Sequence, residues 1–168
     1  MSGTPEPQEL IAQLAAALSA LIEQRPLQDP VMVGIHTGGL WVAEALHRRL
    51  GLSEPLASLD ISFYRDDFTR IGLNPQVRPS NLAIPISERN VILVDDVLYT
   101  GRTIRAAMNE LFDYGRPASI VLAVLVDRGE RELPIAADAA GMTTRLAPGQ
   151  HIKLTGPEPL ELAVLDLT

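Results

Sequence analysis

Apolar residues recur along this chain with helical spacing in some stretches and as short continuous runs in others. Residues 8–24 carry Leu, Ile and Ala at helical spacing, which predicts an amphipathic helix that ends before Pro26. Residues 40–50 predict a second helix, which Gly51 is placed to stop. Residues 102–114 predict a third helix.

The stretches between these helices contain short apolar runs of strand length. Such runs occupy residues 31–36, 56–64, 91–94, 119–126, 151–154 and 162–167. The run at 119–126 is nearly all β-branched or aliphatic, which indicates a strand covered on both faces. Strands that alternate with helices predict a single α/β domain over residues 1–168, with a mainly parallel central sheet flanked by helices. Sheets of this kind bind ligands at the carboxyl ends of their strands.

One such strand end combines acidic residues with a small-residue turn. The run at 91–94 is followed by Asp95 and Asp96, and then by a Thr-Gly-Arg-Thr sequence that opens a helix. Unpaired amides at a helix N-terminus attract phosphate, and Gly101 lets the backbone approach the anion. The carboxylates can accept hydrogen bonds from a ribose diol and stabilise positive charge on the sugar. An ordinary turn with solvated aspartates is the alternative, and the acidic pair at this spacing makes it the weaker one.

Composition and charge limit the class of protein, the partners and the cellular compartment that can be expected. The chain has 168 residues, of which 46% are hydrophobic and 21% charged, as in a globular domain. It has no cysteine, which excludes disulfides and Cys-based metal sites. The net charge is −7, and Lys153 is the only lysine, so a nucleic-acid site would need a local arginine patch. Without a secretory signal pattern or a membrane-length apolar run, we expect a cytoplasmic protein with no membrane association.

Residues 91–103, VILVDDVLYTGRT, resemble the signature of the type I phosphoribosyltransferases at every defining position. The resemblance implies a type I phosphoribosyltransferase fold, in which Asp95 and Asp96 are catalytic and hold the ribose hydroxyls of phosphoribosyl pyrophosphate (PRPP). It also implies a loop whose amides and hydroxyls wrap the 5′-phosphate. That loop comprises Val97, Leu98, Tyr99, Thr100, Gly101, Arg102 and Thr103.

Longer stretches are similar to one subfamily, the pyrimidine-operon attenuation regulators that are also uracil phosphoribosyltransferases. These stretches are VGIHTGG, DISFYRDD, PISERNVILVDDVLYTGRTIRAAMNEL and DYGRPASIVLAVLVDRGERELPI. The resemblance implies transfer of phosphoribosyl from PRPP to uracil, giving UMP and pyrophosphate. It also implies Mg²⁺ that arrives with the substrate, without a dedicated protein metal site, and a homodimer or homotetramer.

The resemblance implies that the turn after the first strand is a pyrophosphate loop. This turn comprises His36, Thr37, Gly38 and Gly39. The alternative is a plain turn between a strand and a helix. The family typically has a basic residue, Thr, Arg and Gly there. In this chain a titratable histidine replaces the first cation and Gly38 replaces the arginine, which removes bidentate contacts to phosphate. Pyrophosphate is then expected to bind more weakly, or through Thr37, Gly38 and Gly39 by backbone amides alone.

The long segment 65–85 shows no sustained period, and it is either a solvated connection or a functional loop. The resemblance favours a flexible hood, beginning at Arg65, Asp66 and Asp67, that folds over the active site and excludes water.

The resemblance also implicates residues near the acceptor base. Arg128 is implied to contact the substrate, and its alternative is a surface arginine paired with Asp127. Ile152 is a candidate for the base pocket, and a core isoleucine is the safer description. Trp41 is expected in the core or a subunit interface.

Two other functions stay open. One is an RNA-binding attenuator with nucleotides as effectors, but the first helix lacks the basic residues of RNA-binding relatives. Glu130, Ala136 and Met142 likewise stand where those relatives have basic side chains, so we predict weak RNA binding or none. The other is a phosphoribosyltransferase for a purine or orotate, because base specificity depends on pocket geometry.

Overall fold

The computed structural model describes residues 3–61 and 81–167, so the predicted hood residues Arg65, Asp66 and Asp67 lie outside the described residues. Helices and strands alternate through most of the described chain, as predicted. In chain order they are α1 (Pro7–Gln24), β1 (Val31–Ile35), α2 (Gly38–Leu50), β2 (Ala57–Leu59), β3 (Asn90–Leu98), α4 (Arg102–Tyr114), β4 (Ser119–Asp127), β5 (Ala139–Thr143), β6 (Gln150–Thr155) and β7 (Glu161–Asp166).

The first five strands form one parallel sheet in the order β2-β1-β3-β4-β5. The strand order therefore reverses between β1 and β3, since β2 lies outside β1 and the later strands follow β3. In open sheets of this kind, the carboxyl ends of the two strands at the reversal flank the ligand crevice. The prediction of a mainly parallel sheet flanked by helices is confirmed, and it places the ends of β1 and β3 at the expected binding edge.

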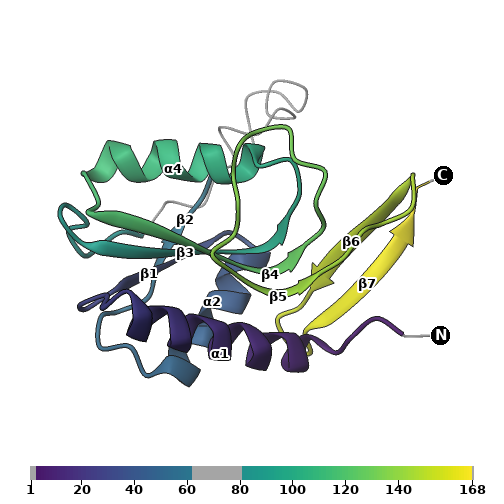
Figure 1. Ribbon diagram of the computed structural model, residues 1–168, viewed down its shortest axis with the longest axis horizontal. Coiled ribbons are helices and arrows are strands. Elements are labelled where there is room, and N and C mark those ends of the chain that lie inside the picture. The colour runs from purple at the N-terminus through teal and green to yellow at the C-terminus, as the bar shows by residue number, and fades with distance from the viewer. Residues whose placement is uncertain (1–2, 62–80, 168) are drawn as a thin grey trace.

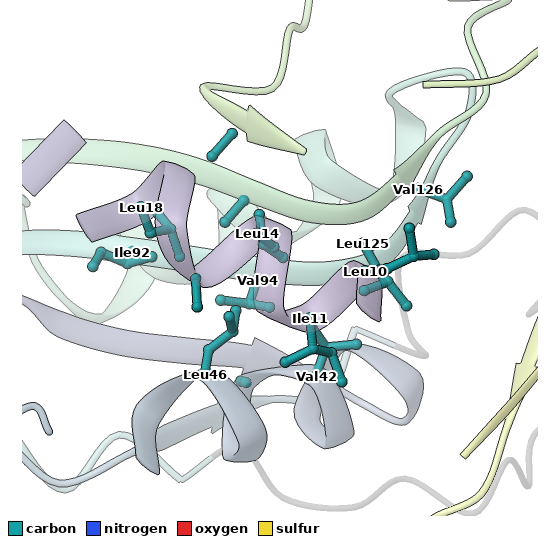
Figure 2. Packing of buried hydrophobic residues seen from close by; sticks show 14 of the residues in the cluster. Leu10, Ile11, Leu14, Leu18, Val42, Leu46, Ile92, Val94, Leu125 and Val126 are labelled. Atoms are coloured by element: carbon teal, nitrogen blue, oxygen red, sulfur yellow. The ribbon is translucent and has the colours of Figure 1, made fainter. Parts of the chain in front are cut away.

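Helices cover both faces of this sheet, with α1 and α2 on one side and α4 on the other (Figure 1). Strand β3 supplies alternate side chains to the two cores. Val94 packs with Leu14 and Leu46 beneath α1 and α2 (Figure 2), whereas Leu93 packs with Leu111 of α4. All five side chains are fully buried, so the central strand that bears the acidic pair is held rigidly on both faces.

Strand β5 was missed in the sequence because AAGMT is short and poor in β-branched residues. Its Gly141 explains part of that composition. A Cβ added there would lie 2.6 Å from the carbonyl oxygen of Leu125 and 2.9 Å from that of Leu10. Close approach of β4 and α1 therefore requires glycine at this position in the strand.

The last two predicted strands exist, but β6 and β7 form an antiparallel hairpin separate from the central sheet. The hairpin lies beside the end of the sheet where β4 and β5 finish (Figure 1). Ile152 and Leu154 of β6 are buried in the core beneath α1 and anchor the hairpin. Trp41 is partly buried against the same core, as expected. None of the described helices is long and apolar enough to cross a bilayer.

Candidate active site

The acidic pair lies within β3 rather than after it, because pairing with β4 continues past Val97 to Leu98. The prediction that the strand ends at Val94 is therefore wrong by four residues. Asp95 is 5% exposed. Its Oδ1 accepts a hydrogen bond from the Asp96 N–H at 2.8 Å, and the Asp96 Oδ1 accepts one from the Val97 N–H at 2.8 Å. Both carboxylates are thus fixed by the backbone that follows them.

The turn between β1 and α2 lies directly against this pair. A Cβ added at Gly39 would lie 2.7 Å from the Val94 carbonyl oxygen and 3.0 Å from the Asp95 Cα. A Cβ at Gly38 would overlap the Asp96 Oδ2 and lie 2.8 Å from its Cγ. The two glycines therefore let the turn approach the acidic residues, a role that the sequence analysis did not assign to them.

Backbone groups dominate the rest of that turn. The Thr37 side chain makes no capping hydrogen bond to α2, which begins at Gly38. The His36 N–H donates to the Leu59 carbonyl at 2.9 Å, and the following peptide bond, to Thr37, is cis. The His36 Nδ1 is buried and has no hydrogen-bond partner among the described residues. The first amides of α2 are therefore presented beside the acidic pair without a side-chain cap.

The predicted phosphate loop surrounds a cavity of about 90 Å³ between the end of β3 and the start of α4. Gly101 precedes the helix with φ of 95°, a backbone conformation that favours glycine. The Thr100 Oγ1 accepts a hydrogen bond from the Arg102 N–H at 3.2 Å. The cavity is lined by Val97, Leu98, Tyr99, Thr100, Gly101, Thr103 and Ile104.

Six of the seven loop residues predicted from the sequence line this cavity, and Arg102 is the exception. Its guanidinium is 3.6 Å from the Glu132 carboxylate, and both side chains are half exposed. Arg102 therefore connects the loop to a neighbouring segment instead of facing the cavity.

That neighbouring segment, residues 128–135, forms a second wall along the phosphate loop. The Arg128 N–H donates to the Leu98 carbonyl at 3.0 Å. The N–H groups of Glu132 and Leu133 both donate to the Thr100 carbonyl, at 2.9 and 3.1 Å. The structure therefore brings the predicted phosphate-binding and base-binding segments together as one hydrogen-bonded unit.

Arg128 is buried in this unit with an exposed fraction of 5%. Its guanidinium lies 3.8 Å from the centre of the Tyr99 ring, and its Nη2 donates to Glu130 at 3.2 Å. Its Nε is buried without a hydrogen-bond partner among the described residues. The alternative of a surface arginine paired with Asp127 is wrong, because Arg131 takes that carboxylate at 2.7 Å.

Ile152 occupies a different environment. It is 8% exposed, belongs to the core beneath α1, and also lines a cavity of about 300 Å³ between the hairpin, the end of β5 and residues 3–5. That cavity shares no lining residue with the phosphate-loop cavity. Its lining comprises Gly3, Thr4, Pro5, Met142, Thr143, Thr144, Leu146, Ile152 and Val164.

Residues 6–159 match the model of the phosphoribosyl transferase domain family. The chain belongs to this family. It is 58% identical over 158 residues to the bifunctional protein PyrR of Pseudomonas aeruginosa, an alignment that covers 94% of this chain and 93% of that protein. It is 55% identical over 157 residues to the bifunctional protein PyrR of Nitrosococcus oceani, covering 92% and 89%.

Solved structures show the same phosphoribosyltransferase fold. A hypoxanthine-guanine phosphoribosyltransferase from Bacillus anthracis superposes with a TM-score of 0.65 at 19% identity, covering 85% of this chain and 84% of that one. The hypoxanthine phosphoribosyltransferase of Trypanosoma cruzi gives a TM-score of 0.65 at 22% identity, covering 84% and 77%. The chain is therefore a PyrR-like member of the type I phosphoribosyltransferases.

One residue of this candidate site was missed in the sequence. Arg131 contacts Asp127 and three backbone carbonyls, yet it stands in a loop where no periodicity marks it. The only available signal was the acidic residue four positions earlier, a spacing that indicates contact on a helix and nothing definite in a loop.

Proposed function

We propose that this chain transfers the phosphoribosyl group of PRPP to N1 of uracil, giving UMP and pyrophosphate. The observation that carries the proposal is the position of the acidic pair between two turns, each of which opens a helix. Gly38 and Gly39 lie against Asp96 and Asp95 on one side, and the phosphate loop begins directly after them on the other. PRPP has the same order of groups, with one anion at each end of a ribose.

The 5′-phosphate would bind in the cavity of the phosphate loop. Amides at the start of α4 beyond that of Arg102, which donates to the Thr100 Oγ1, supply donors together with the hydroxyls of Thr100 and Thr103, and Gly101 permits close approach. The pyrophosphate would bind at the start of α2 through the amides of Thr37, Gly38 and Gly39. No arginine side chain contributes there, because glycine occupies position 38.

The acidic pair would hold the ribose hydroxyls. In the transition state the bond to pyrophosphate is largely broken and the sugar carries positive charge. Asp95 and Asp96 stabilise that charge electrostatically, and their fixed positions in β3 mean that little reorganisation accompanies the reaction. Pyrophosphate leaves with the electron pair of the broken bond, N1 of uracil forms the new bond to the anomeric carbon of the ribose, and the proton of N1 passes to water.

The site suits Mg²⁺ bound with PRPP. The described residues contain no cluster of three or more His, Asp or Glu side chains that could hold a metal. Mg²⁺ commonly keeps several waters and uses one or two carboxylates with substrate phosphates, and the pair at Asp95 and Asp96 offers carboxylates beside both anion sites. When bound, it neutralises charge on the leaving pyrophosphate.

Arg128 would contact the base. Its buried Nε has no partner among the described residues, and its stacking on Tyr99 places it beside the phosphate loop. A base carbonyl would satisfy such a donor. Uracil is favoured over other bases by the high identity to PyrR proteins and by the motifs YRDD and VDRGERELPI.

The test is release of pyrophosphate from PRPP with a panel of uracil, hypoxanthine, guanine and orotate. Uracil should give turnover and the other bases little. Activity with hypoxanthine or orotate and none with uracil would contradict the assignment of the base. If none of the four bases leads to release of pyrophosphate, transfer of the phosphoribosyl group is contradicted altogether.

We further infer a cytoplasmic homodimer or homotetramer, as the resemblance implies. Sedimentation equilibrium at micromolar concentration should give two or four times the chain mass. A monomer over the whole concentration range would contradict this inference.

A further inference from the structure

Arg131 makes five side-chain hydrogen bonds to described residues of the candidate site. Its Nη2 lies 2.8 and 2.7 Å from the two carboxylate oxygens of Asp127. Its Nε donates to the Ile135 carbonyl at 2.8 Å, and its Nη1 donates to the Tyr99 carbonyl at 2.8 Å and to the Gly129 carbonyl at 3.4 Å. One guanidinium thus joins the end of β4, the segment 128–135 and the phosphate loop.

The adjacent arginine, Arg128, has the opposite character. It is more deeply buried than Arg131, yet among the described residues its side chain makes one hydrogen bond, to Glu130, whose side chain is 47% exposed. Its Nε has no partner among the described residues. A buried donor left in this state costs free energy unless a ligand supplies an acceptor. The two arginines therefore differ in role: Arg131 makes contacts within the protein, whereas Arg128 keeps a hydrogen-bond donor for a ligand.

The position of Asp127 explains why Arg128 keeps its free donor only when Arg131 is present. It directly precedes Arg128 in the chain, and its side chain is 17% exposed. Without Arg131, a nearly buried carboxylate would lack its cation, and the neighbouring guanidinium would be the obvious replacement. Pairing with Asp127 would draw Arg128 away from the Tyr99 ring and from the acceptor base.

We propose that Arg131 is a positioning residue that keeps Arg128 available to the base by occupying Asp127. The inference rests on the proposed function, because it assumes that Arg128 contacts the base. It makes a specific claim beyond that function. Loss of Arg131 should be harmful mainly because Asp127 is left unpaired, so removing the charge of Asp127 should repair the damage.

The experiment is a double-mutant cycle read by equilibrium binding of UMP and PRPP, without reliance on turnover. The four chains are wild type, Arg131→Gln, Asp127→Asn and the double variant. Asparagine keeps an oxygen for the Gly129 N–H, which donates to Asp127 at 3.0 Å. Arg131→Gln should weaken UMP binding roughly tenfold, the effect of losing one charge-assisted hydrogen bond. The double variant should recover UMP affinity to within about threefold of wild type.

PRPP is the matched ligand because it has the phosphate and ribose but no base. Its affinity should fall by less than about threefold in Arg131→Gln, since only the Tyr99 carbonyl links Arg131 to the phosphate loop. Arg89→Gln is the control variant. Arg89 also pairs with a carboxylate, Glu54 at 3.0 Å, and donates to a carbonyl, Asp29 at 2.9 Å, but it lies just before β3, at the opposite end of that strand. Its removal should leave UMP affinity unchanged.

Equal losses of UMP and PRPP affinity in Arg131→Gln would show a general structural role and overturn the proposal. So would a double variant that binds UMP no better than Arg131→Gln, or an Arg131→Gln chain that binds UMP like wild type. If wild type binds IMP or orotidine monophosphate instead of UMP, the uracil assignment fails and the same cycle is read with that nucleotide. Failure to bind any of the three would overturn both proposals.

Discussion

The backbone of Gly38 lies directly against the carboxylate of Asp96, so closely that a Cβ at position 38 would overlap the Asp96 Oδ2. Family members typically have an arginine at this position. The structure shows that the glycine here does not merely remove a positive charge, because it also allows the turn to pack against Asp96. In this chain the turn and the acidic pair share one packed contact. A side chain at position 38 would therefore displace either the Asp96 carboxylate or the turn whose amides are proposed to bind the leaving pyrophosphate.

Substitution of this glycine is expected to harm catalysis more than stability. In Gly38→Ala the new methyl group must push Asp96 away from the ribose, and overpacking of this size costs about 1–3 kcal/mol. We expect kcat/KM for PRPP to fall on the order of tenfold to hundredfold. Gly38→Arg should be no better, because its Cβ meets the same carboxylate before its guanidinium can reach the pyrophosphate. Steady-state kinetics with varied PRPP measures both.

Gly3→Ala is the control for this prediction, because a Cβ at Gly3 would meet no atom within 4 Å. Its kinetics should match wild type. A Gly38→Arg chain with higher PRPP affinity than wild type would show that the turn can rearrange to the family's usual form.

Neutralising the acidic pair should abolish most turnover while the fold remains. Asp95→Asn and Asp96→Asn each keep an oxygen for the backbone hydrogen bond that the carboxylate accepts at 2.8 Å. Each removes a charge that stabilises the sugar cation, so kcat should fall by roughly 10²–10³. Asp166→Asn on β7, an exposed aspartate that pairs with Gln150, is the matched control. Turnover close to wild type in both site variants would remove the acidic pair from the mechanism.

The Tyr99 ring is expected to matter more than its hydroxyl. Tyr99→Phe keeps the face on which the Arg128 guanidinium stacks at 3.8 Å, whereas Tyr99→Ala removes it. Arg128 is buried but Tyr99 is 40% exposed, so a cation–π contact of about 1–2 kcal/mol predicts that alanine raises the KM for uracil roughly fivefold to thirtyfold. Phenylalanine should leave that KM within about threefold of wild type. The reverse order would indicate a role for the hydroxyl.

The affinity for RNA should be low and should fall further as the salt concentration is raised. The chain has 21 acidic against 14 basic residues, and the last turn of α1 has no basic side chain. Few phosphate contacts can then form, and nonspecific affinity falls steeply as salt is raised. Filter binding with a pyrimidine-operon leader transcript and a scrambled control should show no difference near physiological ionic strength. A selective, salt-resistant complex would show that the attenuator function is retained.

The fold could be predicted where periodicity was strong. The three helices were placed within two residues of their observed bounds, because α1, α2 and α4 each have a clear apolar face. Strand β5 was missed because its Gly141 serves a close backbone approach rather than a β-propensity pattern. The length of β3 was underestimated because a polar pair normally marks the end of a buried strand. Here the carboxylates accept hydrogen bonds from the strand's own amides, and pairing with β4 nevertheless continues at Val97 and Leu98.

The residues of the candidate site could be selected from the sequence where they belong to a recognisable motif. The rule that parallel sheets bind ligands at the carboxyl ends of their strands selected the glycine turn, the acidic pair and the phosphate loop, and the structure shows that β1 and β3, which bear them, are neighbours. The distinction between Arg128 and Arg131 was not predictable, because two arginines three residues apart in a loop look alike in sequence. Only the structure shows that Arg131 takes Asp127 while Arg128 is buried on Tyr99.

Titration of the chain with PRPP in excess Mg²⁺ tests the central claim most directly, because it asks whether the acidic edge between the two turns is a site for this sugar. Calorimetry should show saturable binding of one PRPP per chain in wild type, and much weaker binding in an Asp95→Asn/Asp96→Asn double variant. Heat that never saturates in wild type, or equal affinity in the double variant, would contradict the account.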